Sequence, residues 1–135
     1  MLKNVHHINL LVKDLDAAVQ RYRDAFSLEE IEYGDLSARG VKTARFRAGE
    51  TWIVLVQPTD PEGEPGKHLA EKGEGLFLLS FEVDSLESAA QAIEDSVHGL
   101  SRTPPRCGLD DWQVQDLEPA AFYGANLQLT EEKRT

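Results

Sequence analysis

The chain has 135 residues, of which 41% are hydrophobic and 28% charged, and these values are typical of a single soluble globular domain. Its formal net charge of −10 argues against non-specific nucleic-acid binding, and no apolar run approaches the length of a membrane span. The single cysteine, Cys107, excludes an internal disulfide bond and favours a reducing compartment. Because the N-terminus also lacks an apolar signal region, we expect a cytoplasmic protein.

The first half of the chain is predicted to form a strand, a helix and three further strands. Val5–Val12 alternates between apolar and other side chains, which predicts a strand, and Asp14 has the chemistry of an N-cap for a helix over Leu15–Phe26. Glycines punctuate the region that follows, and three strands are predicted there, over Glu29–Tyr33, Val41–Arg47 and Thr51–Gln57.

The second half repeats this order after a linker. Pro58–Glu74 is rich in proline, glycine and charge, which predicts a loop. A strand is expected over Leu76–Val83, and Asp84 or Ser85 is expected to cap a helix over Leu86–Val97. The remaining predictions are a helical turn around Lys67–Lys72, a loop over Thr103–Leu109, strands over Trp112–Leu117 and Ala125–Thr130, and Leu100–Thr103 as a candidate for a further strand.

The two halves carry the same pattern at a constant separation. Val12 corresponds to Val83 and Leu15 to Leu86, and the two pairs have the same spacing in the sequence. An internal repeat of this kind predicts an α+β fold of two βαβββ modules in a pseudo-twofold arrangement, with helices outside and a concave mixed-sheet cleft. We expect one domain over residues 1–135, with module 1 at about 1–58, a linker at about 58–75 and module 2 at about 76–131.

Strand alternation divides the side chains between two faces of the predicted sheet. The helix-facing set is Ile8, Leu10, Val12, Ile53, Leu55, Leu79, Phe81, Val83, Leu127 and Leu129. The opposite face carries Glu82 and Arg47 and is expected to line a ligand cleft through His7, Asn9, Arg45, Trp52, Val54, Leu78, Ser80, Asn126 and Gln128. Such a mixture of apolar and polar groups is typical of small-molecule sites.

Three segments of the chain resemble the vicinal-oxygen-chelate superfamily, the group of glyoxalase I, methylmalonyl-CoA epimerase, extradiol dioxygenases and bleomycin-resistance proteins. These segments are His7–Leu15, Arg21–Leu28 and Pro58–Asp84, and the last is most similar to the epimerase branch. The resemblance as a whole covers nearly the entire chain. The resemblance implies the duplicated fold expected from the repeat, and it implies a homodimer, because superfamily members of this length commonly pair modules between chains.

The resemblance also implies where a metal would bind. Metal-dependent members carry one ligand on each of four strands, and these positions fall on His7, Val54, Leu78 and Gln128. Two of the four are aliphatic, so we expect no standard metal site and no cofactor. If a divalent metal such as Zn, Ni, Co, Mn or Fe bound at all, its ligands would be His7 and Gln128. A shift of one residue is no remedy, because alternation predicts that His6 points to the core face.

Two hypotheses on function remain open from the sequence. The first is a superfamily member that binds a small organic molecule in its cleft without a metal. The alternative is an enzyme with a non-standard site, either a lyase or isomerase of the glyoxalase I or methylmalonyl-CoA epimerase type or a dioxygenase, in which His7 and Glu82 are catalytic and Gln128 assists. A regulatory or partner-binding subunit is a third possibility, because fold does not determine function.

Two arginines and a tryptophan on the cleft face are also open to two interpretations. Arg45 and Arg47 could hold a carboxylate or phosphate through paired N–H groups, or they could be solvated strand residues paired with the many acids of the chain. Trp52 could stack on a flat ligand, or it could fill the space left by a lost metal site.

Overall fold

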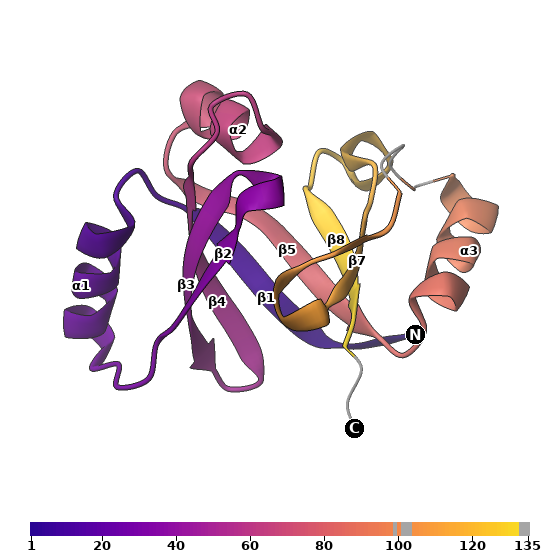
Figure 1. Cartoon of the computed structure of the whole chain (residues 1–135). Coiled ribbons are helices and arrows are strands. Elements are labelled where there is room, and N and C mark those ends of the chain that lie inside the picture. The colour runs from indigo at the N-terminus through magenta and orange to yellow at the C-terminus, as the bar shows by residue number, and fades with distance from the viewer. Residues whose placement is uncertain (99, 101–103, 133–135) are drawn as a thin grey trace. The chain divides into compact units, whose positions relative to one another are not determined.

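The computed structural model describes residues 1–98, 100 and 104–132 (Figure 1). Within this part of the chain the residues group into two compact units, and one of them contains Ile8–Phe77. The second combines Met1–His7 with the described residues from Leu78 onward. Strands β1 (Leu2–Leu11) and β5 (Gly75–Val83) contribute residues to both units. No helix among the described residues is long and apolar enough to cross a membrane.

The unit Ile8–Phe77 has the strand order β2-β3-β4-β1, and its β2-β3 and β3-β4 pairs are antiparallel. Its remaining elements are α1 (Leu15–Phe26), β2 (Glu32–Leu36), η1 (Ser37–Arg39), β3 (Val41–Ala48), β4 (Thr51–Pro58) and α2 (Glu64–Lys72). Helix α1 packs on β3 and β4 through a core of Val12, Leu15, Val19, Ala44 and Leu55. The helix-facing prediction is therefore confirmed for Val12 and Leu55.

The second unit has the strand order β5-β8-β7-β6, in which β5 and β8 are parallel and the other pairs antiparallel. Its remaining elements are α3 (Leu86–Val97), β6 (Arg106–Cys107), η2 (Leu109–Asp111), β7 (Gln113–Asp116), η3 (Pro119–Phe122) and β8 (Leu127–Glu131). Helix α3 lies beside β7 and β8 (Figure 1). The core of this unit consists of Val83, Leu86, Ala89, Leu117 and Leu129, which confirms the predicted apolar face of β5 and β8.

Helices α1 and α3 begin and end in the same way. The Asp14 carboxylate accepts a hydrogen bond from the Ala17 amide at 3.1 Å, and the Ser85 hydroxyl accepts one from the Ser88 amide at 3.2 Å. Both helices end at a residue in the left-handed conformation, Ser27 with φ 53° and His98 with φ 52°. Such caps satisfy terminal backbone groups that helices leave unpaired, so the bounds predicted for both helices are confirmed.

A second pair of contacts relates the last strands of the two modules. The amide of Leu15 donates to the Gln57 side chain at 2.7 Å, and the amide of Leu86 donates to the Glu131 side chain at 2.9 Å. Gln57 and Glu131 thus bind the same backbone group of equivalent helices, which makes them equivalent residues of β4 and β8. This pair of contacts gives the correspondence between the two strands, which the sequence pattern alone leaves undefined.

Two sequence predictions are corrected, and a third falls mostly outside the described residues. The second strand lies at Glu32–Leu36 and not at Glu29–Tyr33, because its register is set by pairing with β3. The strand that seemed to be missing is β6, Arg106–Cys107, within the segment interpreted as a loop. Of Leu100–Thr103, only Leu100 is described, where it forms an isolated bridge with Leu117; the other three residues lie outside the described part of the chain.

Candidate polar site on the sheet

The unit built on β5, β8, β7 and β6 buries polar side chains away from its helix. The residues that share this feature are His6, His7, Ser80, Glu82, Gln128 and Thr130, each at most 4% exposed. A buried polar group costs free energy unless it forms hydrogen bonds, so the partners of these side chains indicate what the face can do.

His6 and His7 form a hydrogen-bonded chain with the carboxylate of Glu132. The Oε2 atom of Glu132 lies 2.7 Å from Nε2 of His6, and Nδ1 of His6 lies 2.8 Å from Nδ1 of His7. With Glu132 ionised, its oxygen accepts the Nε2 proton of His6. A neutral His6 then accepts at Nδ1 from His7, which leaves the lone pair of His7 on its Nε2 atom.

Trp112 holds both imidazole rings in place. Its ring stacks on His7 at 5.0 Å between centroids with an interplanar angle of 23°, and it meets the His6 ring edge-on at 4.5 Å. Trp112 is itself only 3% exposed. Because aromatic contacts restrict both imidazoles, the His7 ring is held in one orientation, which is a property required of a binding or proton-transfer group.

Gln128 presents an acceptor on the same face. Its amide nitrogen donates to Oδ1 of Asp116 at 3.1 Å, and Asp116 is paired in turn with Arg106, whose Nη1 lies 2.5 Å from Oδ2. Asp116 lies directly opposite Gln128 in the β7-β8 ladder. The Oε1 atom of Gln128 is buried and has no hydrogen-bond partner among the described residues. Because the nitrogen is committed to Asp116, this oxygen is oriented to accept from a bound group.

Two other predicted polar residues of this unit, Ser80 and Glu82, form contacts with neighbouring strands. The Ser80 and Thr130 hydroxyls lie 2.5 Å apart. The carboxylate of Glu82 accepts from Asn4 at 3.2 Å and lies 3.8 Å from the Lys3 ammonium. These contacts join neighbouring strands, and they are the arrangement expected of side chains that stabilise a sheet.

The unit Ile8–Phe77 carries a cationic face instead. Arg45 is 5% exposed and its Nη2 donates to Glu32 at 2.9 Å, while the Glu32 side chain is 60% exposed. The guanidinium carbons of Arg45 and Arg47 lie 4.4 Å and 3.9 Å from the centroid of the Trp52 ring. Both distances are within the range of cation–π interactions. Trp52 therefore lies against two protein cations, which favours the arginines over a flat ligand as its present partners.

On the strands of this unit, two further polar side-chain atoms are buried without a hydrogen-bond partner among the described residues. They are Oγ1 of Thr43, whose residue is 3% exposed, and Oδ1 of Asn9, whose residue is half-buried. By strand alternation Thr43 shares the face of Arg45, and Asn9 lies opposite the helix-facing Leu10. Unpaired atoms of this kind accept or donate readily to a bound molecule.

Sequence analysis missed part of this arrangement. His6 was predicted to point to the core face, and that prediction is wrong, since its ring contacts His7 and Trp112 and its Nε2 bonds to Glu132. Asp116 was not a candidate either. Its role depends on the ladder register between β7 and β8, and the role of Glu132 depends on a contact with a residue near the other end of the sequence. The only part of this hydrogen-bonded arrangement that a local sequence pattern indicated was the pair of adjacent histidines.

The donor atoms present do not fit the four-ligand metal site that the resemblance implies. The correspondence of Gln57 with Glu131 makes Val54 of β4 equivalent to Gln128 of β8, so the first module has an aliphatic side chain where the second has an amide. Leu78, equivalent to His7, is also aliphatic, and both aliphatic side chains are buried. Among the described residues no group of three or more His, Cys, Asp or Glu side chains could hold a metal ion.

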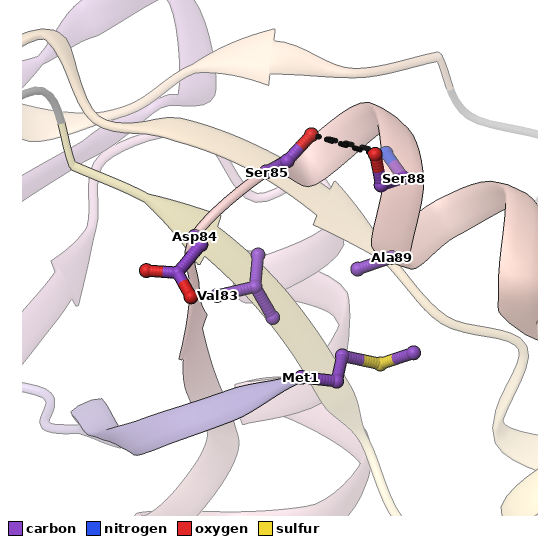
Figure 2. Close-up of a pocket in the computed structure, with 6 residues that line it drawn as sticks. All are labelled: Met1, Val83, Asp84, Ser85, Ser88 and Ala89. Carbon is purple, nitrogen blue, oxygen red and sulfur yellow. Dashed lines mark hydrogen bonds between the residues drawn. The ribbon is translucent and has the colours of Figure 1, made fainter.

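A hollow at the start of α3 is the other feature of the second unit that bears on binding (Figure 2). It has a volume of about 210 Å³ and is lined by Met1, Val83, Asp84, Ser85, Ser88 and Ala89. The hydroxyls of Ser85 and Ser88 lie 3.1 Å apart, and that of Ser85 already caps the helix. The carboxylate of Asp84 beside this hollow is 80% exposed and lies 3.3 Å from the Lys3 ammonium. None of the predicted site residues lines this hollow.

The model of the Glyoxalase/Bleomycin resistance protein/Dioxygenase superfamily matches residues 4–131 of the chain, and the chain belongs to this superfamily. The α+β fold predicted from the internal repeat is thereby confirmed.

The similar proteins include enzymes that act on CoA thioesters. The ethylmalonyl-CoA/methylmalonyl-CoA epimerase of Cereibacter sphaeroides is 26% identical over 96% of this chain and 98% of its own length. A variant of Streptomyces coelicolor methylmalonyl-CoA epimerase, solved in complex with 2-nitronate-propionyl-CoA, is 26% identical with a TM-score of 0.89, covering 99% of this chain and 100% of that one. A hypothetical protein of Bacillus halodurans C-125 is 27% identical with a TM-score of 0.90, covering 97% and 95%.

Proposed function

We propose that this protein binds a small organic molecule on the polar faces of its sheet strands and does so without a four-ligand metal site. The observation that carries the proposal is the pair of aliphatic residues, Val54 and Leu78, at two positions where the family resemblance calls for ligands. Each unit retains a buried polar atom on its own face, Oγ1 of Thr43 in the unit of Val54 and Oε1 of Gln128 in the unit of Leu78. A face that has lost its metal ligands but kept such atoms is suited to recognition by hydrogen bonds.

Methylmalonyl-CoA is the first probe, because similar proteins are named as epimerases of this thioester. Thermal unfolding of protein purified without an affinity tag or chelator is measured with and without the thioester, and again after treatment with EDTA. We expect the thioester to raise the melting temperature equally before and after EDTA, since binding to the folded state alone stabilises it. Elemental analysis showing stoichiometric Zn, Ni, Co, Mn or Fe, together with loss of the shift after EDTA, would contradict the proposal.

A second candidate function is proton transfer at carbon, as in an epimerase that uses no metal. It is favoured by the chain from Glu132 through His6 to His7, which places a lone pair on Nε2 of His7. In that reaction Nε2 would take a proton from one face of the carbon next to a carbonyl group, and a second acid would deliver a proton to the opposite face. Glu82 is the other catalytic residue predicted from sequence, and its carboxylate is engaged with Asn4 and Lys3.

Deuterium uptake separates the two candidates. Methylmalonyl-CoA is incubated with the protein in D₂O, and loss of the α-proton signal is followed by NMR. An epimerase accelerates exchange over the uncatalysed rate, and His7→Ala abolishes that acceleration while His98→Asn, at an exposed position, leaves it unchanged. Binding without any acceleration of exchange supports the first proposal and rejects the second.

We further propose that the protein forms a homodimer and is cytoplasmic. Tyr33 on β2, a strand at the end of its sheet order, is 60% exposed, and an uncovered strand edge is a surface that proteins commonly pair or protect. Sedimentation equilibrium at micromolar concentration should give the mass of two chains. A single-chain mass would rule out a dimer at that concentration.

A further inference from the structure

We propose that the guanidinium of Arg45 supplies the positive charge that a metal ion supplies in metal-dependent relatives, and that it binds an oxyanion of the ligand directly. This inference rests on the proposed function, which it deepens by naming the ligand class as a carboxylate or phosphate. It follows because the donor atoms of the chain do not match the four metal ligands that the family resemblance implies.

The position of Arg45 is the first support. In the β3-β4 ladder Arg45 lies directly opposite Val54, the aliphatic residue at the expected ligand position. Side chains opposite each other in an antiparallel pair have Cβ atoms about 5 Å apart. The side chain of Arg45 therefore leaves the sheet beside the position from which a metal ligand would project in metal-dependent relatives, and on the same face.

The charge around Arg45 is the second support. The chain has a formal net charge of −10, yet Arg45 and Arg47 both lie against the one Trp52 ring. Glu32 reaches Arg45 from a largely exposed position, and Arg47 donates to the backbone oxygen of Glu50 at 3.0 Å. Two guanidinium groups therefore meet at one ring in an acidic protein, which gathers positive charge on this face of the unit. Such a concentration of positive charge attracts anions.

The chemistry of the neighbouring atoms is the third support. A guanidinium binds carboxylate or phosphate oxygens through parallel N–H groups, and it does so best where water is excluded. Arg45 is 5% exposed, so it is in such a place. The Oγ1 atom of Thr43, which has no hydrogen-bond partner among the described residues, lies on the same face of β3, where it can donate to a bound oxyanion. Glu32 then acts as the anion that the ligand displaces from Nη2.

The two tryptophans of the chain provide the experiment, because each one reports on a different unit. Trp52 contacts Arg45 and Arg47, whereas Trp112 contacts His6 and His7. The indole N–H signals of ¹⁵N-labelled protein are followed while methylmalonate or inorganic phosphate is added in the presence of EDTA. We expect a saturable shift of the Trp52 signal with at least one of these anions. The anion that binds more tightly tells carboxylate from phosphate.

Matched variants test whether Arg45 is the binding group. Arg45→Met should weaken binding at least about tenfold, and Arg45→Lys should recover only part of it, because an ammonium lacks the paired N–H geometry. Arg21→Met removes the same charge from an exposed position of α1 and should leave binding unchanged. Glu32→Gln removes the competing carboxylate and should tighten binding by about threefold. This last variant is at an exposed side chain, so it tests the proposal even if Arg45→Met fails to fold.

The outcomes separate the proposed role of Arg45 from the proposed function. If neither anion shifts the Trp52 signal, or if Glu32→Gln leaves binding unchanged, the role of Arg45 is rejected. If methylmalonyl-CoA still stabilises the protein independently of EDTA in that case, the proposed function survives without it. If the anions bind only when EDTA is omitted, a metal and not Arg45 supplies the charge, and both proposals fail.

Discussion

The two modules carry opposite charges at the same ladder position. In the first, Arg45 lies opposite Val54; in the second, Asp116 lies opposite Gln128. The correspondence between β4 and β8 makes Val54 and Gln128 equivalent, so a cation occupies one side of the duplication and an anion the other.

Each of these charges is held by a partner of the opposite sign from the outer strand. Glu32 of β2 pairs with Arg45 at 2.9 Å, and Arg106 of β6 pairs with Asp116 at 2.5 Å. By contrast, the helix-facing sides have remained alike, with the same caps and leucines at equivalent positions. Packing against a helix accepts only apolar groups of suitable volume, whereas the opposite face tolerates any charge that finds a partner. The two modules therefore differ most on the face where we propose that the ligand binds.

The largest expected effect comes from inverting the charge in the first module. Arg45→Asp places a carboxylate beside Glu32 in a buried position and should lower the free energy of unfolding by about 3 kcal/mol. The double variant Glu32→Arg with Arg45→Asp installs the polarity of the second module and should recover at least half of that loss. Urea denaturation of both variants and the wild type measures the effect. Equal losses in the single and double variants would show that the pair is not coupled.

The histidine chain should give the next largest effect. His6→Leu removes the bonds to Glu132 and to Nδ1 of His7 and should cost about 2 kcal/mol, because a buried polar atom loses its partner. His98→Asn is the control, since His98 is exposed and asparagine tolerates its left-handed backbone. Chemical denaturation gives the energies, and ¹⁵N shifts of the His7 ring report its tautomer. A His7 protonated at Nε2 in the neutral wild type would contradict the proposed hydrogen-bond order.

A third test restores a donor to the second unit. Leu78→His adds an imidazole on β5, on the face of Gln128, and should tighten Co²⁺ or Zn²⁺ binding about tenfold over the wild type. Leu79→His is the matched control, because alternation directs residue 79 to the other face of the same strand. Isothermal titration with each metal makes the comparison. Equal affinity in both variants would mean that residue 78 does not share a face with His7 and Gln128.

The smallest effect concerns His68 in α2, whose ring meets Phe77 edge-on at 4.8 Å. Burial lowers the pKa of His68 from its ordinary 6.5, the Lys72 ammonium lowers it further, and Glu71 opposes the shift. The unfolded chain thus binds the proton more readily, so stability present above pH 6.5 is lost as the pH falls below that value. His68→Gln should flatten the dependence of stability on pH between about 5 and 7. If the denaturation midpoint depended on pH equally in the variant and the wild type, groups other than His68 would cause that dependence.

Local pattern was sufficient to predict the helices of the repeat and their packing. Both Leu15–Phe26 and Leu86–Val97 have the predicted bounds, because a cap residue, an apolar stripe and a terminating turn are all encoded within one short segment. The equivalence of Val12 and Val83 likewise follows from the sequence alone, since each residue precedes the same helix signal by the same distance.

Only the tertiary structure decided the chemistry of the polar faces. Strand register joins Asp116 to Gln128 and Arg45 to Val54, and no local property of these residues specifies which pair will form. The same holds for Glu132, which bonds to His6 although the two residues lie near opposite ends of the sequence. It also holds for Trp112, which contacts both histidine rings from a loop beside β7. Hydrogen bonds and ion pairs are short-ranged and depend on geometry, so they become predictable only after the backbone has brought distant segments together.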